Sequence, residues 1–128
     1  EAFGDWERRA RLACEDGEHA RAAALYGQAA QRGETAYFRY RQAGEWLHLA
    51  EYAAAEAAYR EILASRPDAP NARMNLALAV LKQGRRAEAR DLYRAVAEAA
   101  AAAALPDLAA RARLAAELVE RQLALDRE

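Results

Sequence analysis

The sequence repeats a short pattern with a nearly constant period. Three tyrosines, Tyr26, Tyr59 and Tyr93, are 33 and 34 residues apart. An alanine stands four positions before each tyrosine, and a glycine or alanine stands five positions before that alanine. These positions are Ala22, Ala55 and Ala89 for the alanine, and Gly17, Ala50 and Gly84 for the earlier residue. Such a period indicates supersecondary units that stack on one another to bury a shared core.

Each unit is predicted to contain two helices joined by a short turn. A glycine at the turn position accepts the left-handed backbone that ends many helices. We predict first helices over residues 4–15, 36–48 and 70–82, and second helices over residues 18–31, 51–64 and 85–103. Arg32-Gly33 is expected to close the first unit, and Asp68 to cap the helix that begins at Pro70. No segment alternates like a strand, so the predicted fold class is all-α.

Small residues dominate the apolar part of the composition. Hydrophobic residues make up 54% of the chain, but much of this is alanine, and aromatic residues make up only 8%. Because alanine buries little area, the helices must approach closely to form a core. The alanine one turn before each repeated tyrosine lies on the same helix face, where it lets the first helix pack closely. The tyrosine is then expected to fill the space between neighbouring units.

Charge and cysteine content exclude several classes of partner. The net charge of -1 argues against a nucleic-acid partner and against a polybasic membrane anchor. No run of about 18 apolar residues is present, so no membrane insertion is predicted. The single cysteine, Cys14, excludes an internal disulfide and fits a reducing compartment, for which we expect a cytoplasmic location. The alanine- and arginine-rich composition favours a bacterial source, and the first residue, Glu1, predicts a piece of a longer chain.

The repeat resembles the tetratricopeptide repeat (TPR), which combines Trp, Leu-Gly and Tyr in its first helix with Ala, an aromatic residue and a closing Pro. Trp6 and Ala10 match the first helix of the first unit, and Pro67 closes the second unit. Arg39 and Arg73 depart from the pattern, because they stand where tryptophan is expected. In the second unit Trp46 replaces the first-helix tyrosine. Further matches are Ala43, Tyr52, Ala55 and Tyr59 in the second unit, and Leu76, Ala77, Gly84, Ala89 and Tyr93 in the third.

The resemblance implies a right-handed superhelical stack of about three helix-turn-helix repeats and a C-terminal capping helix. The repeats are expected over residues 3–35, 36–69 and 70–103, and the terminal helix over residues 106–126, within a single domain of residues 1–128. The terminal helix is predicted to start at Pro106-Asp107, where a proline and an early acidic residue suit a helix N-terminus.

The terminal helix has a wider apolar face than a simple cap requires. Its predicted inward stripe consists of Leu108, Ala112, Ala115, Val119 and Leu123. Leu114, Leu118 and Leu125 flank that stripe and widen it beyond about 100°. Either this helix packs deeply against the preceding helix, or the three leucines form an oligomer surface.

The sequence does not predict a catalytic or metal site. Cys14 and His19 are five residues apart across a turn, and no third ligand or base is near them in sequence. Cys14 is therefore interpreted as a small, semi-buried residue. No Gly-rich phosphate loop and no metal-ligand spacing is present, so we predict no enzyme, no cofactor and no metal ion.

The family resemblance implies a concave groove, lined by the first helices, that holds a protein or peptide. Arginine and tyrosine are favoured at interfaces, and asparagine can pair with an extended main chain. The predicted groove residues are Arg8, Arg11, Tyr37, Tyr40, Arg41, His48, Asn71, Met74, Asn75 and Lys82. We expect an interaction scaffold or adaptor for an acidic or extended partner segment. Three alternatives stay open: solvated polar groups without a ligand, homo-oligomerisation through the terminal helix, and a regulatory domain of a larger enzyme.

Overall fold

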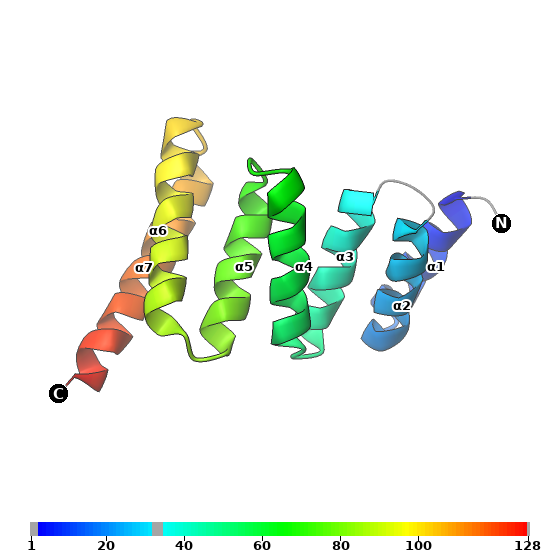
Figure 1. Cartoon of the computed structure of the whole chain (residues 1–128), viewed down its shortest axis with the longest axis horizontal. Coiled ribbons are helices and arrows are strands. Elements are labelled where there is room, and N and C mark those ends of the chain that lie inside the picture. The colour runs from blue at the N-terminus through cyan, green and yellow to red at the C-terminus, as the bar shows by residue number, and fades with distance from the viewer. Residues whose placement is uncertain (1–2, 32–34, 128) are drawn as a thin grey trace. The chain divides into compact units, whose positions relative to one another are not determined.

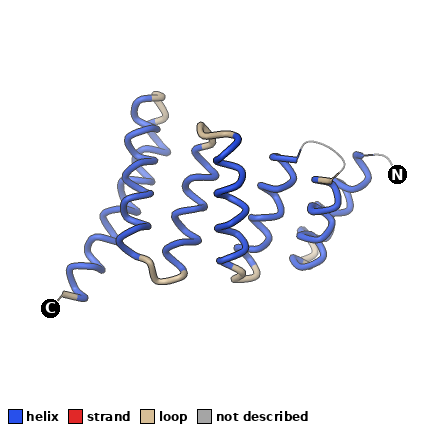
Figure 2. The backbone as a smooth tube through the Cα atoms, viewed as in Figure 1, coloured by secondary structure: helices blue, strands red, loops and turns tan. Residues whose placement is uncertain are grey.

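The computed structural model describes residues 3–31 and 35–127, and these residues form seven α-helices (Figures 1 and 2). The described residues contain no strand, so the all-α prediction is confirmed. Each predicted helix bound lies within one residue of the observed one. The helices are α1 (Phe3–Glu15), α2 (His19–Ala30), α3 (Thr35–His48), α4 (Tyr52–Ser65), α5 (Pro70–Lys82), α6 (Arg86–Ala102) and α7 (Pro106–Asp126). The predicted turn at Arg32-Gly33 and the side chain of Trp6 lie outside the described part of the structure.

The chain divides into two compact units, residues 1–67 and residues 68–128. Unit 1 contains α1 to α4, coloured blue to green in Figure 1, and in it each helix packs on the next. Unit 2 contains α5, α6 and α7, and here too α6 packs on both of the others. The 17-residue α6 and the 21-residue α7 are the longest of the described helices, and they pack on each other.

The turn position of each repeat has the left-handed backbone that the sequence predicts. Gly17 and Gly84 have φ angles of 78° and 87°, and Ala50 adopts a φ of 59° at the matching position. Ala104, at the end of α6, has the same φ as Ala50. At all four turns the next amide donates to the carbonyl five residues earlier, over 2.8–3.3 Å, which closes the helix end. The two alanines take this conformation at a cost of about 1–2 kcal/mol each.

The repeated small and aromatic residues form the core of each unit. Tyr26 and Tyr59 are fully buried in unit 1, and Tyr93 is buried in unit 2. The alanine one turn before each tyrosine has no exposed surface, which confirms the close helix approach inferred from the sequence. Matching alanines on the first helices are equally buried, namely Ala10, Ala43 and Ala77.

The start of α5 differs from the prediction. Ala69, not Asp68, occupies the N-cap position of α5, and no side-chain hydrogen bond caps this helix. Asp68 is one residue too early, because Pro70 already occupies the first turn and its fixed φ starts the helix. The last helix agrees more closely. Its predicted inward residues Ala112 and Val119 are buried, which confirms the orientation of α7.

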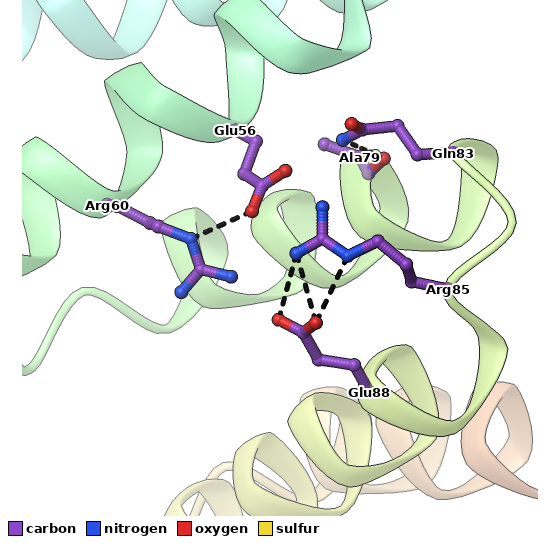
Figure 3. A network of polar contacts seen from close by, with 6 residues as sticks. All are labelled: Glu56, Arg60, Ala79, Gln83, Arg85 and Glu88. Atoms are coloured by element: carbon purple, nitrogen blue, oxygen red, sulfur yellow. Dashed lines mark hydrogen bonds and ion pairs between the residues drawn. The ribbon is translucent and has the colours of Figure 1, made fainter.

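Ion pairs and hydrogen bonds join residues one helical turn apart on the helix surfaces of each unit. Each such pair contributes little to the free energy of unfolding because solvent screens it. In unit 2, Arg85 also bridges the turn before α6 by pairing with a residue in its first turn. Figure 3 draws the contacts Arg60–Glu56 at 2.9 Å, Arg85–Glu88 at 3.0 Å and Gln83–Ala79 at 3.0 Å. None of the described helices is long and apolar enough to cross a bilayer.

Candidate functional site

The first helices of unit 1, α1 and α3, meet at two levels. The hydroxyl of Tyr37 donates to Glu7 Oε1 over 3.3 Å, and the Cys14 sulfur lies within 4.8 Å of a carboxylate oxygen of Glu45. The two contacts are separated by about two helical turns on each helix, so α1 and α3 run side by side in the same direction. Arg11 and Arg41 fall between the two levels on the same helix faces. We call the surface formed by Glu7, Arg11, Tyr37 and Arg41 the α1–α3 face.

Arg41 is anchored to the core of unit 1 by the repeated tyrosine. Its Nη2 donates to the Tyr26 hydroxyl over 3.3 Å, and its guanidinium carbon lies 5.5 Å from the centroid of the Tyr26 ring. This hydrogen bond raises the pKa of the Arg41 guanidinium, which stays charged. The half-buried Arg41 therefore places a fixed positive charge on the α1–α3 face.

The other predicted groove residues of unit 1 differ in accessibility. Arg8, Arg11 and Tyr37 are exposed, with 43% of Tyr37 accessible. Burial against Phe38, followed by the nearby Glu7 carboxylate, raises the pKa of Tyr37. Tyr40 is half-buried, with its ring edge against Tyr59 at a centroid distance of 5.9 Å. The exposed Arg8, Arg11, Tyr37 and His48 are thus more accessible to a ligand than Tyr40.

The predicted groove residues of unit 2 all lie on α5. Asn71 and Lys82 are exposed, and Asn75 is half-buried one turn after Asn71. Met74 packs against the buried cluster of Val96, Ala97 and Ala112, so its side chain is engaged with α6 and α7. The amides and the lysine are therefore the more accessible members on this helix.

The buried stripe of α3 contains two polar side chains. Phe38 is fully buried, and Gln42 and Glu45, one and two turns later, are only 8% and 4% exposed. Gln42 Nε2 donates to the Ala23 carbonyl over 3.0 Å, and its Oε1 accepts a hydrogen bond from Arg39 over 2.8 Å. Both sides of the Gln42 amide are thus satisfied, as burial of a polar group requires.

Glu45 lies at the centre of a cluster that the sequence analysis did not find. Its Oε2 is 2.5 Å from His19 Nδ1, and a carboxylate oxygen of Glu45 lies within 4.8 Å of the Cys14 sulfur. His48, the last residue of α3, stacks on His19 with ring centroids 4.5 Å apart and an interplanar angle of 10°. The position of Glu45 could have indicated this cluster from the sequence. Glu45 belongs to the buried stripe of α3, where a charged residue requires a partner.

The electrostatics of this cluster do not activate Cys14 as a nucleophile. The hydrogen bond to Glu45 and then burial raise the pKa of the Cys14 thiol. A reactive cysteine needs the opposite shift, because the thiolate is the nucleophile. Together, the thiol sulfur, an imidazole nitrogen of His19 and a carboxylate oxygen of Glu45 lie within 4.8 Å of one another, which is a candidate metal-ligand set.

A concave region lies within unit 2, between α6 and α7. It is a surface hollow of about 520 Å³. Three arginines and three glutamates line it, so it has no net preference for an anion or a cation. The lining residues are Arg94, Ala97, Glu98, Arg113, Ala116, Glu117, Glu120 and Arg121.

Comparison with known proteins identifies the fold. No protein-family model matches the sequence, and no curated protein matches it. Three solved structures are similar: a T3SS complex from Aeromonas hydrophila, PcrH from Pseudomonas aeruginosa and the Sgt2 TPR domain from Aspergillus fumigatus. Their TM-scores are 0.84, 0.82 and 0.81 at 19%, 19% and 17% sequence identity. They cover 95%, 92% and 98% of this chain and 83%, 91% and 82% of the other chains.

These similarities confirm the predicted fold class. The chain is an all-α, TPR-like helical repeat domain, similar to a structure that is itself described as a TPR domain. At 17–19% identity the similarity concerns the fold alone. A function therefore has to be argued from the side chains of this chain.

Proposed function

We propose that the chain is a protein-interaction scaffold that binds an acidic or extended segment of a partner protein along its first helices. The observation that supports this proposal is the α1–α3 face, on which exposed Arg11 and Tyr37 accompany the fixed charge of Arg41. Arginine pairs with carboxylates through two parallel hydrogen bonds, and tyrosine supplies apolar contact area with a polar tip. A TPR-like stack fits such a role.

The predicted residues of unit 2 extend this chemistry on their own helix. The exposed Asn71 carries both a donor and an acceptor that suit an extended main chain, and Lys82 adds a positive charge. We propose no enzymatic role, because the Cys14 thiol has a raised pKa and the other polar groups match binding more than catalysis.

Peptide binding to charge-reversed variants tests this proposal. The probes are fluorescent extended peptides rich in Asp and Glu, and matched peptides rich in Lys, titrated by fluorescence polarisation. We expect the acidic peptides alone to bind, and Arg8→Glu combined with Arg11→Glu to weaken their affinity at least about tenfold. The control combines Arg111→Glu with Arg113→Glu on α7, which changes the net charge equally at exposed positions.

Two results would contradict the proposal. One is equal binding of acidic and basic peptides by the unmodified chain. The other is an equal loss of affinity in both double variants, because this would reflect overall charge and not the α1–α3 face. Far-UV circular dichroism of each variant checks that its helices are intact.

Self-association through α7 is a second candidate function. Leu114, Leu118 and Leu125 are 56%, 53% and 61% exposed, and their spacing of four and seven residues puts them on one helix face. Sedimentation equilibrium of the chain and of Leu118→Glu tests this candidate. We expect a dimer that Leu118→Glu dissociates, whereas Leu12→Glu, at a similarly exposed leucine of α1, leaves it intact. A chain that is monomeric at high concentration would exclude this candidate.

A further inference from the structure

We propose that Cys14, His19 and Glu45 form a binding site for a zinc-class divalent cation, with water in the fourth coordination position. The three residues come from α1, α2 and α3, and their ligand atoms lie within 4.8 Å of one another. Zinc is bound in proteins by cysteine sulfur, imidazole nitrogen and carboxylate oxygen, usually in a tetrahedral arrangement. The site is separate from the peptide-binding role proposed above and does not depend on it.

The distances in the cluster suit a tetrahedral ion after small side-chain movements. With bonds of about 2.0–2.3 Å, a tetrahedral site keeps its ligand atoms roughly 3.3–3.6 Å apart. The 2.5 Å contact between His19 Nδ1 and Glu45 Oε2 has to open by about 1 Å, and the widest separation, 4.8 Å or less, has to close by a similar amount. Side-chain rotations alone supply movements of this size.

The burial of Glu45 gives the cation a physical role. Its side chain is only 6% exposed, and a carboxylate in the core requires hydrogen bonds or opposite charge to compensate the lost water. The groups that face it are a thiol and an imidazole, both of which are also metal ligands. Arg41, the cation nearest to this cluster on α3, directs its Nη2 to Tyr26 instead. A divalent ion at this point would neutralise both the carboxylate and the bound thiolate.

The local structure holds the ligands in place. Gly17, with its φ of 78°, makes the tight turn that brings His19, the first residue of α2, back toward Cys14 in the last turn of α1. His48 stacks flat on the His19 ring and fixes its orientation, the role that outer-shell groups have around metal ligands. Cys14 itself packs against the buried cluster around Tyr26 and Phe38, so its sulfur has a defined position.

The donor set selects the class of metal ion. A soft sulfur and a borderline nitrogen disfavour Mg²⁺ and Ca²⁺, which prefer all-oxygen sites. Zn²⁺ suits the mixed sulfur, nitrogen and oxygen set, and Co²⁺ is a spectroscopically visible substitute with the same geometry.

Titration of the reduced full chain with Co²⁺ tests the proposal. We expect a thiolate-to-cobalt charge-transfer absorption and tetrahedral d–d bands that saturate at one ion per chain and disappear when Zn²⁺ is added. Cys14→Ser should abolish the charge-transfer absorption. His19→Gln and Glu45→Gln should each weaken binding by more than the about 10–100-fold effect of losing an outer-shell partner. The matched control is Glu15→Gln, which removes an exposed carboxylate beside Cys14 and should leave binding unchanged.

Three outcomes would overturn the site. The first is a folded, reduced chain that shows no charge-transfer absorption with excess Co²⁺. The second is an absorption that survives both His19→Gln and Glu45→Gln, because a lone thiol would explain it. The third is an equal loss in Glu15→Gln, which would indicate general electrostatic attraction. If Glu45→Gln fails to fold by circular dichroism, His19→Gln decides, since His19 is 26% exposed at the start of its helix.

Discussion

Unit 1 and unit 2 bury different side chains around the same repeated alanine and tyrosine positions. Unit 1 contains the fully buried rings of Tyr26, Phe38 and Tyr59, and it also buries Gln42 and Glu45. The described core of unit 2 consists of alanine, valine and leucine around Tyr93. Aromatic rings and satisfied polar groups require specific partners, whereas small aliphatic residues mainly require close packing. The same repeat therefore supports a chemically diverse core in unit 1 and a plain aliphatic core in unit 2.

The charged residues of the two units also differ: both units have ion pairs at the surface, but among the described residues only unit 1 buries a charged side chain. In unit 2 the ion pairs lie at the surface, where Arg90 and Arg94 both contact Glu120 and Arg86 contacts Asp126. In unit 1 the carboxylate of Glu45 is buried against His19. The comparison teaches that the buried polar side chains among the described residues, and with them the candidate metal site, belong to unit 1. If the two cores differ in this way, the variants below should affect the stability of the two units unequally.

Truncation of the largest core side chains should give the largest effect. Phe38→Ala in unit 1 should reduce the free energy of unfolding by about 3–5 kcal/mol, because it removes a fully buried ring and leaves a cavity. Val96→Ala in unit 2 should cost about 2 kcal/mol. Denaturant unfolding measures both, with far-UV circular dichroism for all helices and tryptophan fluorescence for unit 1, since Trp6 and Trp46 both belong to residues 1–67. Equal losses of unfolding free energy in Phe38→Ala and Val96→Ala would contradict the difference between the two cores.

Gly27→Ala should cause the next largest loss in the free energy of unfolding, because α2 and α3 approach closely at Gly27. A Cβ at Gly27 would lie 2.6 Å from Gln42 Nε2, which is held by its bond to the Ala23 carbonyl. We expect a loss of about 1–3 kcal/mol in the free energy of unfolding, from the displaced amide and its broken hydrogen bond. Combined with Gln42→Ala, the same change should become neutral or stabilising, because the clash is removed.

A double-mutant cycle of these two positions measures their coupling. The control is Gly44→Ala on α3, where an added Cβ meets nothing within 4 Å. It should stabilise the chain by about 0.5–1 kcal/mol through helix propensity. Additivity of Gly27→Ala and Gln42→Ala would show that the buried amide does not constrain the packing of unit 1.

The left-handed alanines provide a test in which the two units should behave alike. Ala50 in unit 1 and Ala104 in unit 2 share a φ of 59°. Ala50→Gly and Ala104→Gly should each stabilise the chain by about 0.5–1 kcal/mol, because the relieved backbone strain exceeds the entropy that glycine loses on folding. Thermal and denaturant unfolding measure the change. A destabilised Ala50→Gly chain would mean that alanine is preferred at this turn.

The smallest effect is expected at the half-buried Arg90–Glu120 ion pair of unit 2. The hydrogen bond from Arg90 lowers the pKa of Glu120. Since this pKa is lower in the folded chain, the contribution to stability is present above the unfolded pKa and is lost as pH falls through the folded pKa. When the pH falls from neutral to about 3, the free energy of unfolding of Glu120→Gln should therefore decrease slightly less than that of the unmodified chain.

The measurement for this pair is the denaturation midpoint at several pH values. Glu117→Gln, which removes an exposed carboxylate of α7, serves as the control. An identical pH profile for Glu120→Gln and the unmodified chain would indicate that solvent screening removes the contribution of the pair entirely.

Much of the fold was predictable because local rules determine it. The period of the tyrosines, the glycines at Gly17 and Gly84 and the proline at Pro70 gave helix bounds to within one residue. These signals act over one or two turns of helix, and the structure changes them little. The predicted cap at Asp68 was wrong by one position, since a proline can start a helix without a capping side chain.

The candidate sites were predictable only in part. The exposed arginines and Tyr37 follow from the helix faces, which the sequence period defines. The roles of Arg41 and Met74 do not follow from it, because each makes a specific contact with another helix, Arg41 with Tyr26 and Met74 with the cluster around Val96. Such contacts depend on packing between helices and not on position within one.

The sequence by itself determined a stack of paired helices, since a regular period of small and aromatic residues can bury its apolar faces in few other ways. It also placed Cys14 and His19 on either side of one turn. Only the tertiary structure brought Glu45, 26 residues beyond His19, to the same point. The physical reason is that the sequence period of 3.6 residues shows which residues share one face of a helix, but not which other helix packs on that face. Packing between three helices brought a thiol, an imidazole and a buried carboxylate together.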